Sequence, residues 1–106
     1  MLELKIEEIL IESDDYPEQL KNIYNPPLKL FVLGDKKILI QKAIAIVGSR
    51  DATEYGKKAA LQFSKDLTKN GINIISGLAL GIDTYAHLGA MHTNSISKTI
   101  AVLGGG

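Results

Sequence analysis

The 106-residue chain has no cysteine, no tryptophan and few aromatic residues, which make up 6% of it. Without cysteine it can form no disulfide and offers no thiolate for metal binding or nucleophilic attack. The scarcity of aromatic side chains argues against an extended platform on which nucleobases stack. Its apolar runs are too short for a helix that crosses a membrane. Acidic residues near the start replace the basic-then-apolar order of a signal peptide, so we expect a cytoplasmic protein.

Arginine is also scarce, because Arg50 is the only one among the 12 basic residues. The formal net charge is zero, yet acidic residues outnumber lysines in residues 1–35 and lysines outnumber acidic residues in residues 36–106. This asymmetry fits a second part that meets a polyanion, two parts that attract each other, or lysines that only solvate a surface. Charge alone leaves these three interpretations open.

Residues 1–40 are expected to form a small amino-terminal extension with a short helix and a strand. Residues 2–11 mix apolar and acidic side chains and fit either a strand or a helix. Pro17 is placed for the first turn of a helix, and Pro26-Pro27 ends that helix because a residue before proline avoids helical angles. Leu28–Leu33 then has the composition of a short strand.

Residues 41–106 have the pattern of the amino-terminal part of a Rossmann-like domain. Three continuous apolar runs alternate with two helical patterns, and such runs are typical of parallel strands covered on both faces. The expected strands are Ala43–Val47, Ile72–Ile75 and Thr99–Leu103, and the expected helices run from Thr53 to Asn70 and from Asp83 to about Met91. The predicted fold class is therefore α/β, a three-layer α/β/α arrangement around a parallel sheet, with right-handed crossovers.

The ends and faces of these helices can also be predicted. Asp51 and Glu54 have the spacing of a capping box, Gly71 is placed for a left-handed end, and Asp83 can cap the second helix. Apolar residues recur at helical spacing on the first helix and should bury one face. These residues are Ala59, Ala60, Phe63 and Leu67.

Each of the three apolar runs is followed by glycine. We call the residues that directly follow each run a strand exit. Since parallel strands end at one edge of the sheet, where open α/β sheets bind ligands, the three strand exits should lie close together. The first exit, Gly48-Ser49-Arg50, adds a hydroxyl and a guanidinium, whose planar donors match phosphate oxygens. The alternative is a surface arginine that pairs with Asp51 or Glu54.

The second exit, "SGLALGID", is neither a dinucleotide fingerprint nor a P-loop. A carboxylate at Asp83 would repel a phosphate placed directly on the helix end. Any anion would therefore be held by the glycine backbone and Arg50. A tight turn with a helix cap explains the same spacing without a ligand.

Other polar residues give no stronger signal. Asp83 and His87 are four apart on the second helix, a spacing more often explained by a local hydrogen bond than by a metal. Ser49 and Ser76 have no histidine placed by the sequence to activate them. We predict no metal, no catalytic residue and no cofactor.

The combination of motifs is more selective than any one of them. "IAIVGSR", "YGKKAA", "GINIISGLALGIDTYAHLGA" and "KTIAVLGGG" together resemble the DNA-processing protein A family, DprA or Smf. The preceding "YPEQLKNIYNPPLKLFVLGD" agrees, so the resemblance spans residues 16–106. It implies a Rossmann-like domain that binds single-stranded DNA and loads RecA recombinase on it, in DNA recombination, natural transformation and competence.

The resemblance also implies which residues bind DNA. Gly48-Ser49-Arg50 matches the motif whose arginine lines the DNA pocket, and Ser76–Asp83 matches its second wall. The candidate nucleic-acid-binding residues are Gly48, Ser49, Arg50, Ser76, Gly77 and Gly81.

Family members are longer, with further strands and surfaces for RecA and for a homodimer, so we expect this chain to be an amino-terminal portion. The main alternative is a Rossmann-like nucleotide-binding or phosphoribohydrolase enzyme, although the chain lacks that enzyme's Pro-Gly-Gly-x-Gly-Thr loop. A third possibility is a scaffold that only dimerises, in which the glycine exits serve packing.

Overall fold

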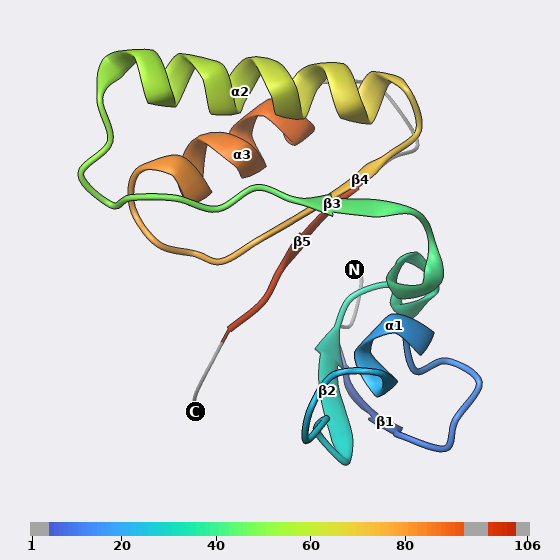
Figure 1. The fold of residues 1–106 in the computed structure, drawn as a ribbon. Helices are drawn as coiled ribbons and strands as arrows, with labels where there is room; N and C mark the ends of the chain where they lie inside the picture. The colour runs from blue at the N-terminus through green and yellow to red at the C-terminus, as the bar shows by residue number, and fades with distance from the viewer. Residues whose placement is uncertain (1–4, 93–97, 104–106) are drawn as a thin grey trace. The chain divides into compact units, whose positions relative to one another are not determined.

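A computed structural model of the chain describes residues 5–92 and 98–103. The chain divides into two compact units, a first unit of Met1–Gln41 and a second unit of Lys42–Gly106. Figure 1 labels the strands and α-helices of each. In the described part of the chain, no helix is both long and apolar enough to cross a membrane.

The first unit is a two-stranded antiparallel sheet with short helices. Its elements are β1 (Ile6–Leu10), α1 (Glu18–Lys21), β2 (Lys29–Leu33) and a 3-10 helix, η1 (Lys36–Ile40). The ambiguous run at the start is thus a strand over its described part, and it pairs with β2 from Ile6↔Leu33 to Leu10↔Lys29. The buried Tyr16 packs inside this unit and donates a 2.7 Å hydrogen bond to the carbonyl of Pro27.

The second unit is a β-α-β-α-β arrangement, as predicted. Its elements are β3 (Ala43–Ala45), α2 (Glu54–Lys69), β4 (Asn73–Ser76), α3 (Ile82–Met91) and β5 (Thr99–Ala101). The strands lie in the order β3-β4-β5 and all pairs are parallel, which confirms the α/β class and the parallel sheet. The carboxyl ends of all three strands therefore share one edge.

Both helices lie on the same side of this sheet (Figure 1). Ile74 forms the buried core with Ala86 and Ala90, and Ile46 packs against it. Val47, which follows β3, is 69% exposed. Within the second unit, the described residues supply two of the three predicted layers, the sheet and the helices on one of its faces.

The predicted buried face of α2 is confirmed at Ala60 and at Leu67, which packs against the core, but it is wrong at Phe63. Phe63 is 64% exposed, whereas Ala60, Ser64 and Thr68 are buried. The reason is a close helix crossing: a side chain at Gly89 of α3 would come within 2.7 Å of Ser64 Cβ, and Ser64 Oγ donates to the carbonyl of Ala86. Such an approach selects small residues, which hydrophobic periodicity does not detect.

The predicted capping box is also wrong. Thr53 caps α2, and its Oγ1 accepts a 3.0 Å hydrogen bond from the amide of Gly56. Glu54 pairs with Lys57 at 3.3 Å instead of reaching back to Asp51. At the other end Gly71 has a φ of +82°, so the left-handed glycine after α2 is confirmed.

Candidate functional site

The exits of β3 and β4 pack directly against each other at the carboxyl edge of the sheet. Gly81 has a φ of +85°, and a Cβ there would lie 2.6 Å from the carbonyl oxygen of Arg50 and against that of Ser49. The amide of Ile82, at the start of α3, donates a 3.2 Å hydrogen bond to the carbonyl of Ser49. The structure thus brings together two segments about thirty residues apart in the chain.

Two other glycines serve the same packing. A Cβ at Gly48 would lie 2.7 Å from Ile82 Cγ1, and a Cβ at Gly77 would lie 2.7 Å from Asp83 Oδ2. At both positions the chain's own atoms fill the space that a side chain would take. Internal packing therefore explains the need for glycine at both positions, which agrees with the alternative that these glycines serve packing. The same packing determines where the two strand exits lie.

The buried Ser76 ties the three strand exits together. Its Oγ donates a 2.6 Å hydrogen bond to the carbonyl of Ile46, and its own carbonyl accepts a 2.9 Å hydrogen bond from the amide of Val102. Since the hydroxyl donates its hydrogen within the sheet, the structure supports a positioning role for Ser76 more than direct contact with a ligand. The glycines that follow the third run, Gly104–Gly106, lie outside the described residues.

Arg50 is exposed, and its guanidinium has no ion pair or hydrogen bond with another residue of the described part of the chain. The alternative pairing with Asp51 or Glu54 is not seen. Glu54 pairs with Lys57, and the amide of Asp51 donates a 3.1 Å hydrogen bond to Ser49 Oγ. All guanidinium donors of Arg50 are thus available, and the Ser49 hydroxyl, which accepts in this contact, keeps its hydrogen for a ligand.

His87 does not bond Asp83, contrary to the predicted local contact. Its Nε2 lies 2.5 Å from the carbonyl oxygen of Gly77, and its Nδ1 lies 2.6 Å from Thr99 Oγ1. A carbonyl only accepts, so Nε2 carries a proton and donates to Gly77. His87 thereby joins α3 to the exit of β4 and to β5.

Asp83 is placed differently from the predicted cap. Gly81 occupies the cap position of α3, no side chain caps this end, and Asp83 lies buried in the first turn. Within the described ranges no three His, Asp or Glu side chains are grouped to hold a metal ion. The role of Thr99 was missed, because its contact with His87 depends on strand register that the sequence pattern does not show.

Comparisons with known proteins match nearly the whole chain. A family model described as DNA recombination-mediator protein A matches residues 7–106. The DNA processing protein DprA of Bacillus subtilis is 41% identical over 102 residues, which are 95% of this chain and 34% of that protein. Protein Smf of Escherichia coli is 42% identical over 95 residues, 90% of this chain and 25% of that protein. The chain spans about a third or less of these relatives.

Two solved structures share the fold. The X-ray structure of DNA processing protein A from Streptococcus pneumoniae gives a TM-score of 0.83 at 39% identity, over 92% of this chain and 34% of that one. The Helicobacter pylori protein, described for its single-stranded DNA binding mode, gives a TM-score of 0.73 at 35% identity, over 89% of this chain and 41% of that one.

Proposed function

The chain belongs to the DNA recombination-mediator protein A family, and we propose that it binds single-stranded DNA at the carboxyl edge of the β3-β4-β5 sheet. The Helicobacter pylori relative, described for its single-stranded DNA binding mode, supports this substrate class. The observation that carries the proposal is the packing of Gly81 on the Ser49–Arg50 backbone, which leaves the Arg50 side chain exposed beside the second exit.

Each site residue then has a physical task. Arg50 donates to a phosphate with two nitrogens, and Ser49 donates its hydroxyl hydrogen. Gly48, Gly77 and Gly81 let the exits approach each other closely enough to present these donors together. Ser76 holds the strand exits in place from inside the sheet.

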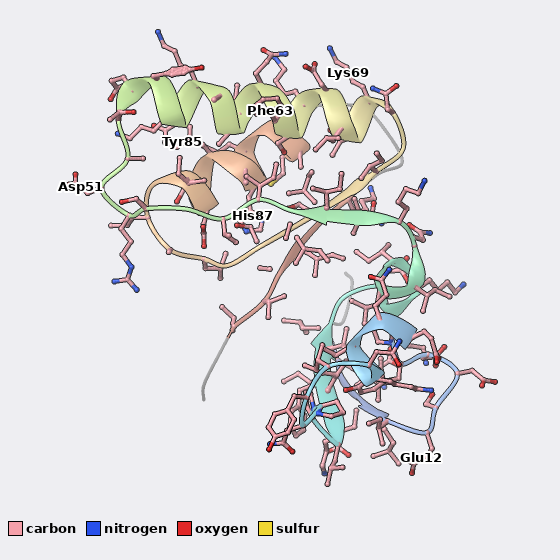
Figure 2. All side chains as sticks on the ribbon, viewed as in Figure 1. Glu12, Asp51, Phe63, Lys69, Tyr85 and His87 are labelled. Atoms are coloured by element: carbon pink, nitrogen blue, oxygen red, sulfur yellow. The ribbon has the colours of Figure 1, made fainter. Side chains whose placement is uncertain are left out.

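The binding should be dominated by phosphate contacts and should weaken as salt rises. We would measure fluorescence anisotropy of a labelled thymidine oligomer with the unaltered chain, Arg50→Ala and Lys69→Ala at two salt concentrations. Lys69→Ala is a matched control because it also removes one positive charge. Lys69 lies at the carboxyl end of α2, whereas Asp51 lies near the other end of this helix (Figure 2).

We expect Arg50→Ala to weaken binding by about tenfold or more, because a hydrogen bond to a charged group contributes roughly 1.5–3 kcal/mol. The dependence on salt should become shallower in this variant and stay unchanged in Lys69→Ala. Equal affinity of Arg50→Ala and the unaltered chain would show that Arg50 does not bind the phosphate.

For the whole protein we propose recombination mediation without catalysis: it loads RecA on single-stranded DNA in the cytoplasm, acts as a homodimer and serves natural transformation. The family description and the names of the relatives support this over a nucleotide-processing enzyme. Release of a free base from a nucleoside monophosphate would contradict the non-enzymatic part. Failure of the whole protein to speed RecA assembly on DNA covered by a single-strand-binding protein would contradict the mediator part.

A further inference from the structure

Asp83 is a buried carboxylate with one oxygen atom that accepts no hydrogen bond from the described residues. It is 7% exposed, and its Oδ1 has no hydrogen-bond partner in the described part of the chain. On a helix the Cα–Cβ bonds tilt toward the amino terminus, so this side chain in the first turn of α3 points back toward the strand exits. Its Oδ2 indeed lies 2.7 Å from the place of a Gly77 Cβ.

The charge of Asp83 lies favourably at the positive end of α3, but the hydrogen bonds that usually explain an aspartate at this position are not made. Asp83 does not cap α3, and His87 one turn later bonds Gly77 and Thr99 instead. An unpaired buried oxygen of a carboxylate opposes folding, and such groups in native structures are often explained by function. Asp83 is therefore a candidate to accept a hydrogen bond from a ligand.

The chemistry of single-stranded DNA limits what that donor can be. An ionised carboxylate only accepts hydrogen bonds, and the phosphates and sugar oxygens of DNA also only accept. The N–H donors lie on the bases, and in thymine the sole N–H is at N3, on the edge that pairs in a duplex. A carboxylate in this place would repel the backbone and attract a base whose pairing edge is free.

Resting on the proposed function, we propose that Asp83 accepts a hydrogen bond from the pairing edge of a nucleobase and thereby makes the site select single-stranded over double-stranded DNA. The contact between Ile82 and Ser49 places Asp83 and Arg50 at the same end of α3. One nucleotide can then meet a cation at its phosphate and a carboxylate at its base. Because Oδ1 is buried in the free chain, the exit segments shift slightly when the base enters.

The first test uses the unaltered chain and two oligomers. We expect a thymidine oligomer methylated at every N3 to bind about tenfold more weakly than the plain oligomer, since the methyl group removes the only base N–H. Equal affinities would overturn the role of Asp83 while leaving the proposed function in place. If the plain oligomer does not bind at all, the proposed function falls and this inference falls with it.

The second test uses Asp83→Ala, with Asp66→Ala on α2 as a control that removes the same charge. Asp66 is exposed and accepts a hydrogen bond from Gln62 at 2.9 Å. We expect Asp83→Ala to bind the plain oligomer about tenfold more weakly, to bind both oligomers equally, and to bind a duplex no more weakly than before. Its melting temperature should change little, because the loss of the unpaired oxygen offsets the loss of a favourable charge at the start of α3.

The competing explanations predict other results. If the carboxylate only stands near the DNA, its loss relieves repulsion and strengthens binding of both single strands and duplex. If Asp83 is purely structural, its loss lowers the melting temperature and both affinities together. Either result overturns the proposal, and so does an equal loss of affinity in Asp66→Ala.

Discussion

The first unit surrounds one buried aromatic side chain, Tyr16, whereas the second unit buries mainly small and polar side chains between two helices and a sheet. At the surface of the first unit, Lys36 forms ion pairs with Glu7 and Asp15. In the second unit the side chains of Ser64, Ser76 and His87 form hydrogen bonds with backbone carbonyls. His87 also bonds the side chain of Thr99.

This difference shows which parts of the molecule tolerate change. The hydrogen bond of Tyr16 and the exposed ion pairs of Lys36 link chain segments through side chains, which adjust more easily than packed backbone does. At the carboxyl edge of the second unit, the backbone at Gly81 packs directly against the backbone of Ser49 and Arg50. A single methyl group should therefore disturb the candidate site more than the loss of a hydroxyl or a charge disturbs the first unit.

The largest effect should come from Gly81→Ala. The added methyl would strain a residue at φ +85° and would also meet the carbonyl oxygens of Ser49 and Arg50. With ψ at −129°, Gly81 lies outside the left-handed helical region, where strain of about 1–3 kcal/mol and overpacking of about 1–3 kcal/mol should together lower the free energy of unfolding by roughly 3 kcal/mol or more. Urea denaturation measures this loss, and binding of a thymidine oligomer should weaken because Arg50 is displaced.

Gly71→Ala is a control at a second glycine with positive φ, where an added methyl meets no neighbour. Gly71 has nearly the same φ, +82°, but nothing lies within 4 Å of a Cβ built there. Only the strain remains, so we expect a loss of about 1 kcal/mol and no change in DNA binding. If the two variants lose equal stability, crowding between the exits is not what holds the edge together.

How far the sequence predicts this edge depends on topology. Parallel strands joined by helices must end together, so the meeting of Gly48–Arg50 with Ser76–Asp83 followed from the order of the elements. The contact of His87 with Thr99 did not follow, because it needs the register of β5 against β4. The unpaired oxygen of Asp83 could not be foreseen either, since a first-turn aspartate is normally read as a cap.

The helix faces teach a similar lesson. Apolar spacing placed Phe63 inside, but α2 approaches α3 closely at Gly89, where the small Ser64 faces it. Periodicity reports which side chains are apolar and does not report how near two helices lie. Small residues at a spacing of four, as in Ala60, Ser64 and Thr68, are the signal that was available.

A smaller effect is expected from Tyr16→Phe in the first unit. The ring stays buried, but the carbonyl of Pro27 loses the 2.7 Å hydrogen bond from Tyr16 Oη. The free energy of unfolding should fall by about 1 kcal/mol, as measured by urea denaturation with Tyr24→Phe, an exposed tyrosine, as control. A loss as large as that of Gly81→Ala would contradict the proposed difference between the units.

The smallest effect concerns the charge of Lys36. Its Nζ lies 3.1 Å from Asp15 Oδ2 and 3.1 Å from Glu7 Oε2, and these contacts, chiefly the one with Asp15, raise the pKa of Lys36 above 10.5. The folded chain therefore holds this proton more tightly than the unfolded chain does. The resulting stability is fully present below about pH 10.5 and is lost as the pH rises through the higher pKa of the folded state.

Lys36→Met should remove this part of the pH dependence, and Lys37→Met, an exposed neighbour, should retain it. The measurement is the urea midpoint of each variant and of the unaltered chain between about pH 9 and pH 12, taken as a difference because other lysines and tyrosines also titrate there. Exposed ion pairs contribute little, so a small shift is expected. If the two variants show the same pH dependence, the ion pairs of Lys36 do not stabilise the first unit, and only its buried ring distinguishes it from the second.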